Sequence, residues 1–458
     1  MSTIANLNGE SGMNDVVDSG KKLELPEKNR VNFQSPHFTG RFIVVFPKDS
    51  TGAVKALKKG PGLQVASSSD FSDRAIKKTL EEGEAHFFET LGVAVVSADY
   101  SRVQKICTAN INGVVPMMVP ERFVYGAGTL SIETEYLRGY HDGVKSLAST
   151  LTDIAEPQLA KPQLRRTGAN NIKASSSEFT WGLLATNASK SRYTGEGIKV
   201  AVLDTGFDVT HPDFLGRGII TKSFIPGDGD VLDMRGHGTH CVGTACGPRS
   251  GTDIPAYGCA PKATIYMGKV IGNNGSAEEE WLLNGINWAL ENQCDIVSLS
   301  LESPYDPNHP ELPQYEQIGE RALKTGQLII AAAGNRSSRP YYLKPVSIPA
   351  CASTIMAVAA VDSNNEVAAF SCAGIYQGCD VDISGPGVAV ESSSPSPEMR
   401  RVDNGTSMAT PHVAGIAALH MESDKSLRGK LLWNRLVQSA TSLHGEKGDI
   451  GAGLVQAP

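Results

Sequence analysis

The sequence predicts an α/β protein with a mostly parallel sheet covered by helices on both faces, preceded by a small α+β domain. Two observations predict this order. From Trp181 onward, short apolar segments rich in β-branched residues alternate with longer amphipathic segments. Before that point, strand-like and helix-like segments alternate within one shorter stretch that begins near Arg41.

The strands expected in the large sheet are continuous apolar runs, as is typical of strands buried on both faces. They cover residues 198–203, 264–270, 296–301, 327–333 and 355–361. Amphipathic segments such as 276–292 and 315–325 lie between them and are expected to be helices. In sheets of this kind, functional side chains gather where strands end and helices begin.

The small domain is expected at residues 38–126 and the large one at 179–458. The small domain contains strand patterns at 41–46, 86–96 and 114–119 and helix patterns at 54–59 and 101–109. This order indicates a split βαβ, ferredoxin-like arrangement. Residues 1–37 are expected to form a flexible polar tail, and residues 127–178 a connector with a helix within 132–151.

The composition excludes several classes of function. The 458 residues carry a formal net charge of -7 and no dense basic run, so no nucleic-acid partner is expected. No apolar run is long enough to span a membrane, and the first 30 residues hold no export signal, which favours an intracellular start. The eight cysteines are dispersed; Cys372 and Cys379 could bridge a loop, and Cys241 is expected to be buried.

Asp204 and His237 occur at two glycine-containing junctions. Asp204 follows an apolar strand directly, where a carboxylate could orient a histidine, although an Asp that caps a turn is the plainer alternative. Glycines flank His237, which could act as a general base near neutral pH. Zinc binding by His237 and His240 is disfavoured because no glutamate lies between them, and His240 is expected to be structural.

Ser407 is expected at the start of a helix of small and apolar residues. Its backbone N–H would have no helical partner there and could face a developing negative charge. The alternative is an ordinary helix N-cap at Thr406 or Ser407. Asn335 follows another apolar strand, so that its side-chain amide could donate to the same oxyanion. His412 lies within the apolar helix and is expected to pack there.

The three segments together resemble the signature motifs of the subtilisin-like (subtilase) family of serine peptidases. Asp204, His237 and Ser407 stand in the family's chain order of acid, base and nucleophile, and the resemblance extends from about Trp181 to the C-terminus. It implies a subtilisin-like fold and a serine endopeptidase that needs no cofactor. Asn335 and the Ser407 N–H would form the oxyanion hole.

The resemblance also implies where substrate and calcium would bind. The protein or peptide substrate would pair with the strand that continues into Glu302, which stands where relatives usually carry glycine, and would pass beside Gly334. The other residues expected in this substrate site are Ser298, Leu299, Ser300 and Leu301. Glu302 could favour basic substrates, narrow the pocket or face solvent. Asp213 matches a position that often binds a structural calcium ion, for which no further ligand is evident.

Residues 38–126 resemble the family's inhibitory propeptide in the order of their elements. The chain is therefore expected to be a zymogen that inhibits itself and is then cut near Tyr125 or Gly126, or within residues 127–178. Two other functions use the same fold: a silent peptide-binding or regulatory protein, and a peptide ligase or macrocyclase that uses the same triad.

Overall fold

The large sheet has seven strands, all paired in parallel, in the order β14-β13-β12-β10-β6-β8-β7. The computed structural model describes residues 37–46, 52–59, 62–71, 80–108, 115–126, 178–249, 255–307 and 310–458. The strands of this sheet are β6 (Lys199–Asp204), β7 (Ile220–Ser223), β8 (Thr264–Lys269), β10 (Ile296–Leu299), β12 (Leu328–Ala332), β13 (Met356–Val361) and β14 (Ile383–Pro386). Four of the five predicted strands are confirmed with small shifts of their ends, the strand predicted over 296–301 is present only as far as Leu299, and β7 and β14 are additional.

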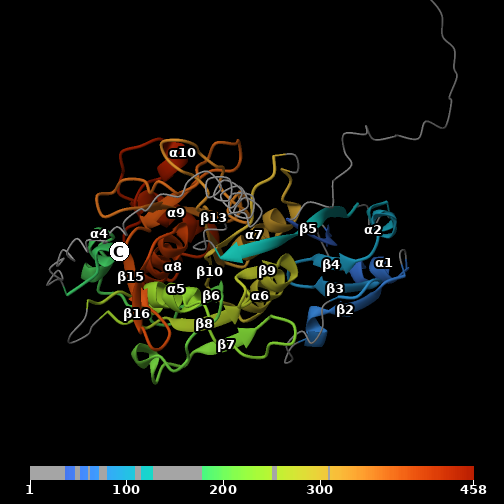
Figure 1. The fold of residues 1–458 in the computed structure, drawn as a ribbon, viewed down its shortest axis with the longest axis horizontal. Coiled ribbons are helices and arrows are strands. Elements are labelled where there is room, and N and C mark those ends of the chain that lie inside the picture. The colour runs from blue at the N-terminus through green and yellow to red at the C-terminus, as the bar shows by residue number, and fades with distance from the viewer. Residues whose placement is uncertain are drawn as a thin grey trace, which may run out of the picture.

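Helices cover both faces of this sheet (Figure 1), as predicted. One face packs on α5 (His237–Cys246) and α8 (Thr406–Ser423), the other on α6 (Glu279–Glu291) and α7 (Pro313–Lys324). Alternate strand residues separate the two cores: Val200 and Val202 face α5 and α8, while Ala201 and Leu203 face α6. Further elements of this domain are α4 (Trp181–Ala185), α9 (Gly429–Ser439), α10 (Lys447–Ile450), β15 (Val390–Ser393) and β16 (Arg400–Asp403).

A smaller sheet forms the N-terminal part of the described chain, with strand order β5-β1-β4-β3-β2. Its elements are β1 (Phe38–Val45), α1 (Ala53–Lys59), β2 (Gln64–Ser67), β3 (Glu84–Phe88), β4 (Val93–Ser97), α2 (Tyr100–Cys107) and β5 (Met117–Gly126). The prediction of one strand over 86–96 was wrong. The chain turns back at Gly92, whose φ of +68° favours glycine, and β3 and β4 pair as an antiparallel hairpin.

The small sheet packs against the large domain through one of its faces. Phe42 and Val44 point to a core shared with α1 and α2, whereas Ile43 and Val45 join the core that contains α6 and α7. Apolar packing therefore docks this sheet on the outside of the larger domain, next to α6 and α7 (Figure 1).

A buried ion cluster also crosses this contact. The Arg41 guanidinium donates to Glu121 of its own sheet at 2.6 and 2.8 Å. The same guanidinium lies 2.7 Å from Glu278 and 2.9 Å from Glu280 of the large domain. Glu121 in turn accepts from the backbone N–H of Glu280 at 2.9 Å, at the start of α6, where a helix favours negative charge. These bonds fix the position of β5 relative to α6.

The last residues of β5 leave the small sheet and pair with two short strands of the large domain. They are β9 (Ser276–Glu278) and β11 (Leu301–Glu302), and both pairings are antiparallel. Two predicted elements change for this reason. The helix expected over 276–292 begins only at Glu279, and the strand expected over 296–301 divides at Ser300.

The disulfide joins Cys351 to Cys379, so the Cys372–Cys379 bridge considered from the sequence was wrong. Cys372 is a free, buried thiol. Sequence spacing cannot show which cysteines the fold brings together. The tail expected at 1–37, apart from its last residue, and the connector expected at 127–178, apart from its last residue, lie outside the described residues. Within the described residues, no helix is both long and apolar enough to cross a membrane.

Candidate active site

Asp204, His237 and Ser407 lie at element ends on one edge of the large sheet. Asp204 is the last residue of β6, His237 is the first of α5, and Ser407 is the second of α8. α5 and α8 pack side by side on the same face of the sheet. Because carboxyl ends of parallel strands meet at one edge, residues distant in sequence are brought together there.

Asp204 and His237 form a buried pair. The Nδ1 atom of His237 lies 2.7 Å from Oδ1 of Asp204, which also accepts from the Thr205 N–H at 2.7 Å. Burial disfavours the imidazolium, but the negative charge of Asp204 outweighs it, and the pKa of His237 is raised well above its ordinary 6.5. Asp204 can therefore orient the imidazole and stabilise its protonated form.

Close backbone packing is needed to bring the two residues together. A Cβ atom on Gly238 would lie 2.2 Å from the carbonyl oxygen of Gly206, so only glycine fits. Gly206 itself has a φ of +122°. These two glycines let the start of α5 approach the end of β6.

Ser407 is fully buried at the N-terminus of α8. Its Oγ donates to the carbonyl oxygen of Ser300 at 3.4 Å, and the Ser300 hydroxyl donates to the Ser407 carbonyl at 2.8 Å. Among the described residues, no side chain or backbone group bonds Nε2 of His237. A bond between a nucleophile and its base often tightens only when substrate is bound.

Cys241 contacts both His237 and the backbone of Ser407. Its Sγ is 3.9 Å from Nδ1 of His237 and 3.5 Å from the Ser407 carbonyl oxygen. It is fully buried, as expected, and burial raises the pKa of its thiol. Within the described residues, Asp204, His237 and Cys241 form the only cluster with metal-ligand spacing. The Asp204–His237 bond already occupies Nδ1 of the histidine, so this cluster does not suit a metal ion.

Asn335 follows β12 and faces the start of α8. Its Oδ1 accepts from the Thr406 N–H at 2.9 Å and from the Thr406 hydroxyl at 3.0 Å. These two bonds fix the orientation of the amide, because only its oxygen can accept. Its NH₂ group is the branch able to donate to an oxyanion at Ser407.

The residues expected to bind substrate divide into two groups. Ser298 and Leu299 belong to β10, whose neighbours β6 and β12 occupy both of its edges, so their assignment to a substrate site was wrong. Ser300 contacts Ser407, while Leu301 and Glu302 pair with Gly126 and Tyr125. Gly334, with a φ of +105°, lies against Ser347 and Glu302.

His240 and His412 are structural, and Asp213 does not suit calcium. Burial lowers the pKa of His240 to about 3 and that of His412 to about 4, and each ring bonds a backbone carbonyl. The Asp213 carboxylate accepts from the Tyr257 hydroxyl at 2.6 Å and lies 3.8 Å from the Arg400 guanidinium. The Arg400 guanidinium and the Tyr257 phenol thus lie beside Asp213, where a calcium ion would need further oxygen ligands.

Sequence reasoning missed Asp233, which holds the start of α5. Its two carboxylate oxygens accept from the N–H groups of Arg235, Gly236 and Thr239 and from the hydroxyls of Thr205 and Thr239, at 2.8–3.1 Å. An acidic residue shortly before a helix start is a recognised capping signal and could have indicated this role. Asp233 is therefore a positioning residue for His237.

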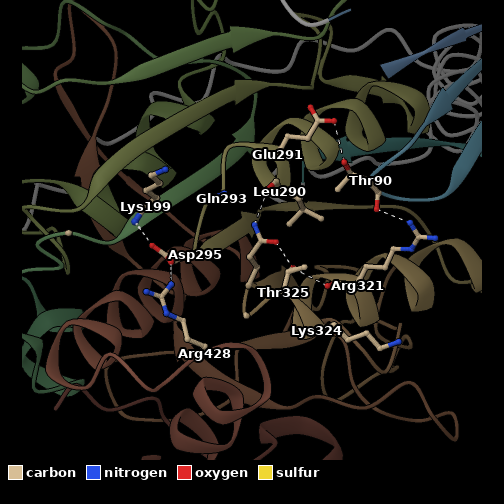
Figure 2. A pocket seen from close by; sticks show the side chains of 13 residues that line it. Thr90, Lys199, Leu290, Glu291, Gln293, Asp295, Arg321, Lys324, Thr325 and Arg428 are labelled. Atoms are coloured by element: carbon tan, nitrogen blue, oxygen red, sulfur yellow. Dashed lines mark hydrogen bonds and ion pairs between the residues drawn. The ribbon is translucent and has the colours of Figure 1, made fainter. Parts of the chain in front are cut away.

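A separate cleft of about 970 Å³ opens at the amino ends of the same strands (Figure 2). Asp295, just before β10, bonds Arg428 and the N–H of Lys199, while Arg321 donates to the Thr90 carbonyl of the small sheet at 3.0 Å. None of Asp204, His237, Ser407 or Asn335 lines this cleft. It lies at the opposite edge of the sheet from the candidate active site.

The parallel sheet, the Asp–His pair and the nearby serine define the class of a subtilisin-like serine peptidase. The subtilase family model matches residues 195–453, and the chain belongs to this family. Subtilisin Savinase of Lederbergia lenta is 40% identical over 280 residues, which are 60% of this chain and 96% of that protein. Subtilisin E of Bacillus subtilis is 35% identical over 318 residues, covering 68% and 79%.

A solved structure shows the same fold. Sphericase matches with a TM-score of 0.53 and 28% identity, and the match covers 62% of this chain and 99% of sphericase. The predicted fold and the predicted family are therefore confirmed. The chain is a serine peptidase that acts on protein substrates.

Replacing Asn335 with alanine is expected to lower kcat about 10²–10³-fold, a size measured in another member of the family. The amide would no longer stabilise the oxyanion, whereas the bond between Asp204 and His237 would remain. Steady-state kinetics on a peptide substrate, with thermal midpoints as a folding control, measure this. A variant in which only KM changes, with kcat unaffected, would contradict the role of Asn335 in stabilising the oxyanion.

Proposed function

We propose that the chain is a serine endopeptidase made as a zymogen, with Ser407 as nucleophile, His237 as base and Asp204 as orienting acid. The observation that carries this proposal is the pairing of β5 with β11. It brings an extended segment of the chain to the short strand that directly follows Ser300, the residue that contacts Ser407. A substrate backbone added to the same edge would take the same position.

The proposed reaction needs only water and groups of this protein. Ser407 Oγ attacks the peptide carbonyl and His237 accepts its proton, while Asn335 and the Ser407 N–H stabilise the oxyanion. His237 then gives the proton to the leaving amine, and an acyl-enzyme remains on Ser407. Water, activated by His237, hydrolyses it. No step uses a metal or cofactor.

Residues 38–126 act in this proposal as an intramolecular inhibitor. β5 pairs with the edges of β9 and β11 that a substrate would otherwise use, so a substrate cannot pair there while β5 stays bound. The packing of Ile43 and Val45 on the large domain and the Arg41 ion cluster support tight docking. The first cut is expected shortly after Gly126, where β5 ends.

The test combines the intact mass of the purified full chain with labelling by a fluorophosphonate, which reacts with activated serines. We expect the N-terminal segment to be removed by a cut shortly after Gly126 and one phosphonyl group on the peptide that contains Ser407. We also expect casein to be cut into peptides with a gain of one water for each bond cleaved. Products joined without a gain of water would indicate a ligase instead. A full-length, unlabelled chain that leaves casein intact would contradict the proposal.

A further inference from the structure

We propose that Glu302 fills the space for the substrate side chain immediately before the cleaved bond, so that the enzyme cuts after glycine or alanine. This inference rests on the proposed peptidase function and names its substrate class. Glu302 is 5% exposed and belongs to β11, the strand that pairs with β5.

The strand register puts Glu302 on the relevant face. In an antiparallel pair, directly opposite residues have their side chains on the same face, and every second residue shares that face. Tyr125 is opposite Glu302. A substrate residue opposite Ser300 lies two positions further along, so its side chain projects on the side of Glu302. Because Ser300 contacts Ser407, the substrate residue opposite Ser300 is the one immediately before the cleaved bond.

The Glu302 carboxylate reaches across this space to the segment that follows β12. Its Oε1 accepts from the Asn335 N–H at 3.4 Å, and its Oε2 accepts from the Ser347 hydroxyl at 2.7 Å. A Cβ atom on Gly334 would lie 2.6 Å from Oε2, so the carboxylate already contacts this wall closely. The side chain thus joins both sides of the space and leaves room only for a small group.

The contacts favour exclusion of large side chains over attraction of basic ones. Besides its two hydrogen bonds, the Glu302 carboxylate forms an ion pair with Arg336, whose Nε lies 3.5 Å from Oε2. A substrate lysine would have to displace this arginine and the Ser347 hydroxyl, and replacing satisfied buried bonds is costly. The chain's own segment after Tyr125 reads Gly126-Ala127-Gly128, which contains only small residues.

Four peptides that differ only in the residue before the cleaved bond test this: glycine, alanine, phenylalanine and lysine. With the self-processed enzyme, kcat/KM for alanine is expected to exceed that for phenylalanine and for lysine at least about tenfold, within the range a pocket can discriminate. Glu302→Gly is expected to raise the phenylalanine-to-alanine ratio at least about tenfold. Glu302→Gln, equal in size but uncharged, is expected to keep the preference for small residues.

Three outcomes would overturn the inference. If the wild-type enzyme prefers lysine and the Glu302→Gln variant does not, Glu302 serves to recognise a positive charge. Equal cleavage after phenylalanine and alanine, unchanged in Glu302→Gly, shows that the space lies elsewhere. Both results leave the proposed peptidase intact, whereas cleavage of none of the four peptides, with Ser407 unlabelled by a fluorophosphonate, overturns the proposed function as well.

Discussion

Replacing Ser407 with alanine is expected to abolish self-processing and to lower kcat for peptide hydrolysis about 10⁶-fold, as measured for the nucleophile of a subtilisin. No acyl-enzyme can form without the hydroxyl. The buried site around it is expected to stay folded, because the bonds from Ser300 and Cys241 go to the Ser407 backbone carbonyl. Intact mass and single-turnover kinetics measure the two effects.

The matched control is Ser384→Ala. Ser384 is also fully buried, and its hydroxyl donates to the Ile450 carbonyl at 3.0 Å, away from the candidate site. This variant is expected to process itself and to keep its turnover, with at most a small loss of stability. If Ser407→Ala retained about 1% of turnover or still removed its N-terminal part, Ser407 would not be the nucleophile.

The central strands of the large domain could be predicted from local sequence because each of them is a short apolar run. β10, β12 and β13 are apolar along their whole length, so their burial on both faces follows from the composition of short segments. Asp204 at the end of one such strand and Asn335 shortly after another then lie at one edge of a parallel sheet.

What could not be predicted depends on contacts between distant parts of the chain. β9 is helical in pattern but becomes a strand because β5, more than 150 residues earlier, pairs with it. Cys379 bonds Cys351 because the fold brings them together, although Cys372 is nearer in sequence. The hydrogen-bond partners of Glu302 likewise come from two segments after β12. The sequence alone therefore could not decide whether Glu302 fills the substrate pocket or attracts basic side chains.

Replacing Asp204 with asparagine is expected to lower kcat about 10⁴-fold, as in other serine proteases that lose this carboxylate. Two causes combine. An asparagine amide can hold the imidazole in the wrong tautomer, and no negative charge remains to stabilise the imidazolium. The bond between Asp204 and Nδ1 of His237 and the burial of both residues make the loss large.

The same variant also tests the electrostatic role of Asp204 through the pH dependence of kcat/KM. His237 acts as a base only when neutral, so wild-type activity is expected to increase as the pH rises through a midpoint above 6.5. Asparagine removes the charge that raises this pKa, while burial continues to lower it, so the midpoint of Asp204→Asn is expected to move to lower pH. The exposed Asp230→Asn serves as a control with an unchanged profile. A midpoint that stayed in place would mean that another group sets the pKa of the base.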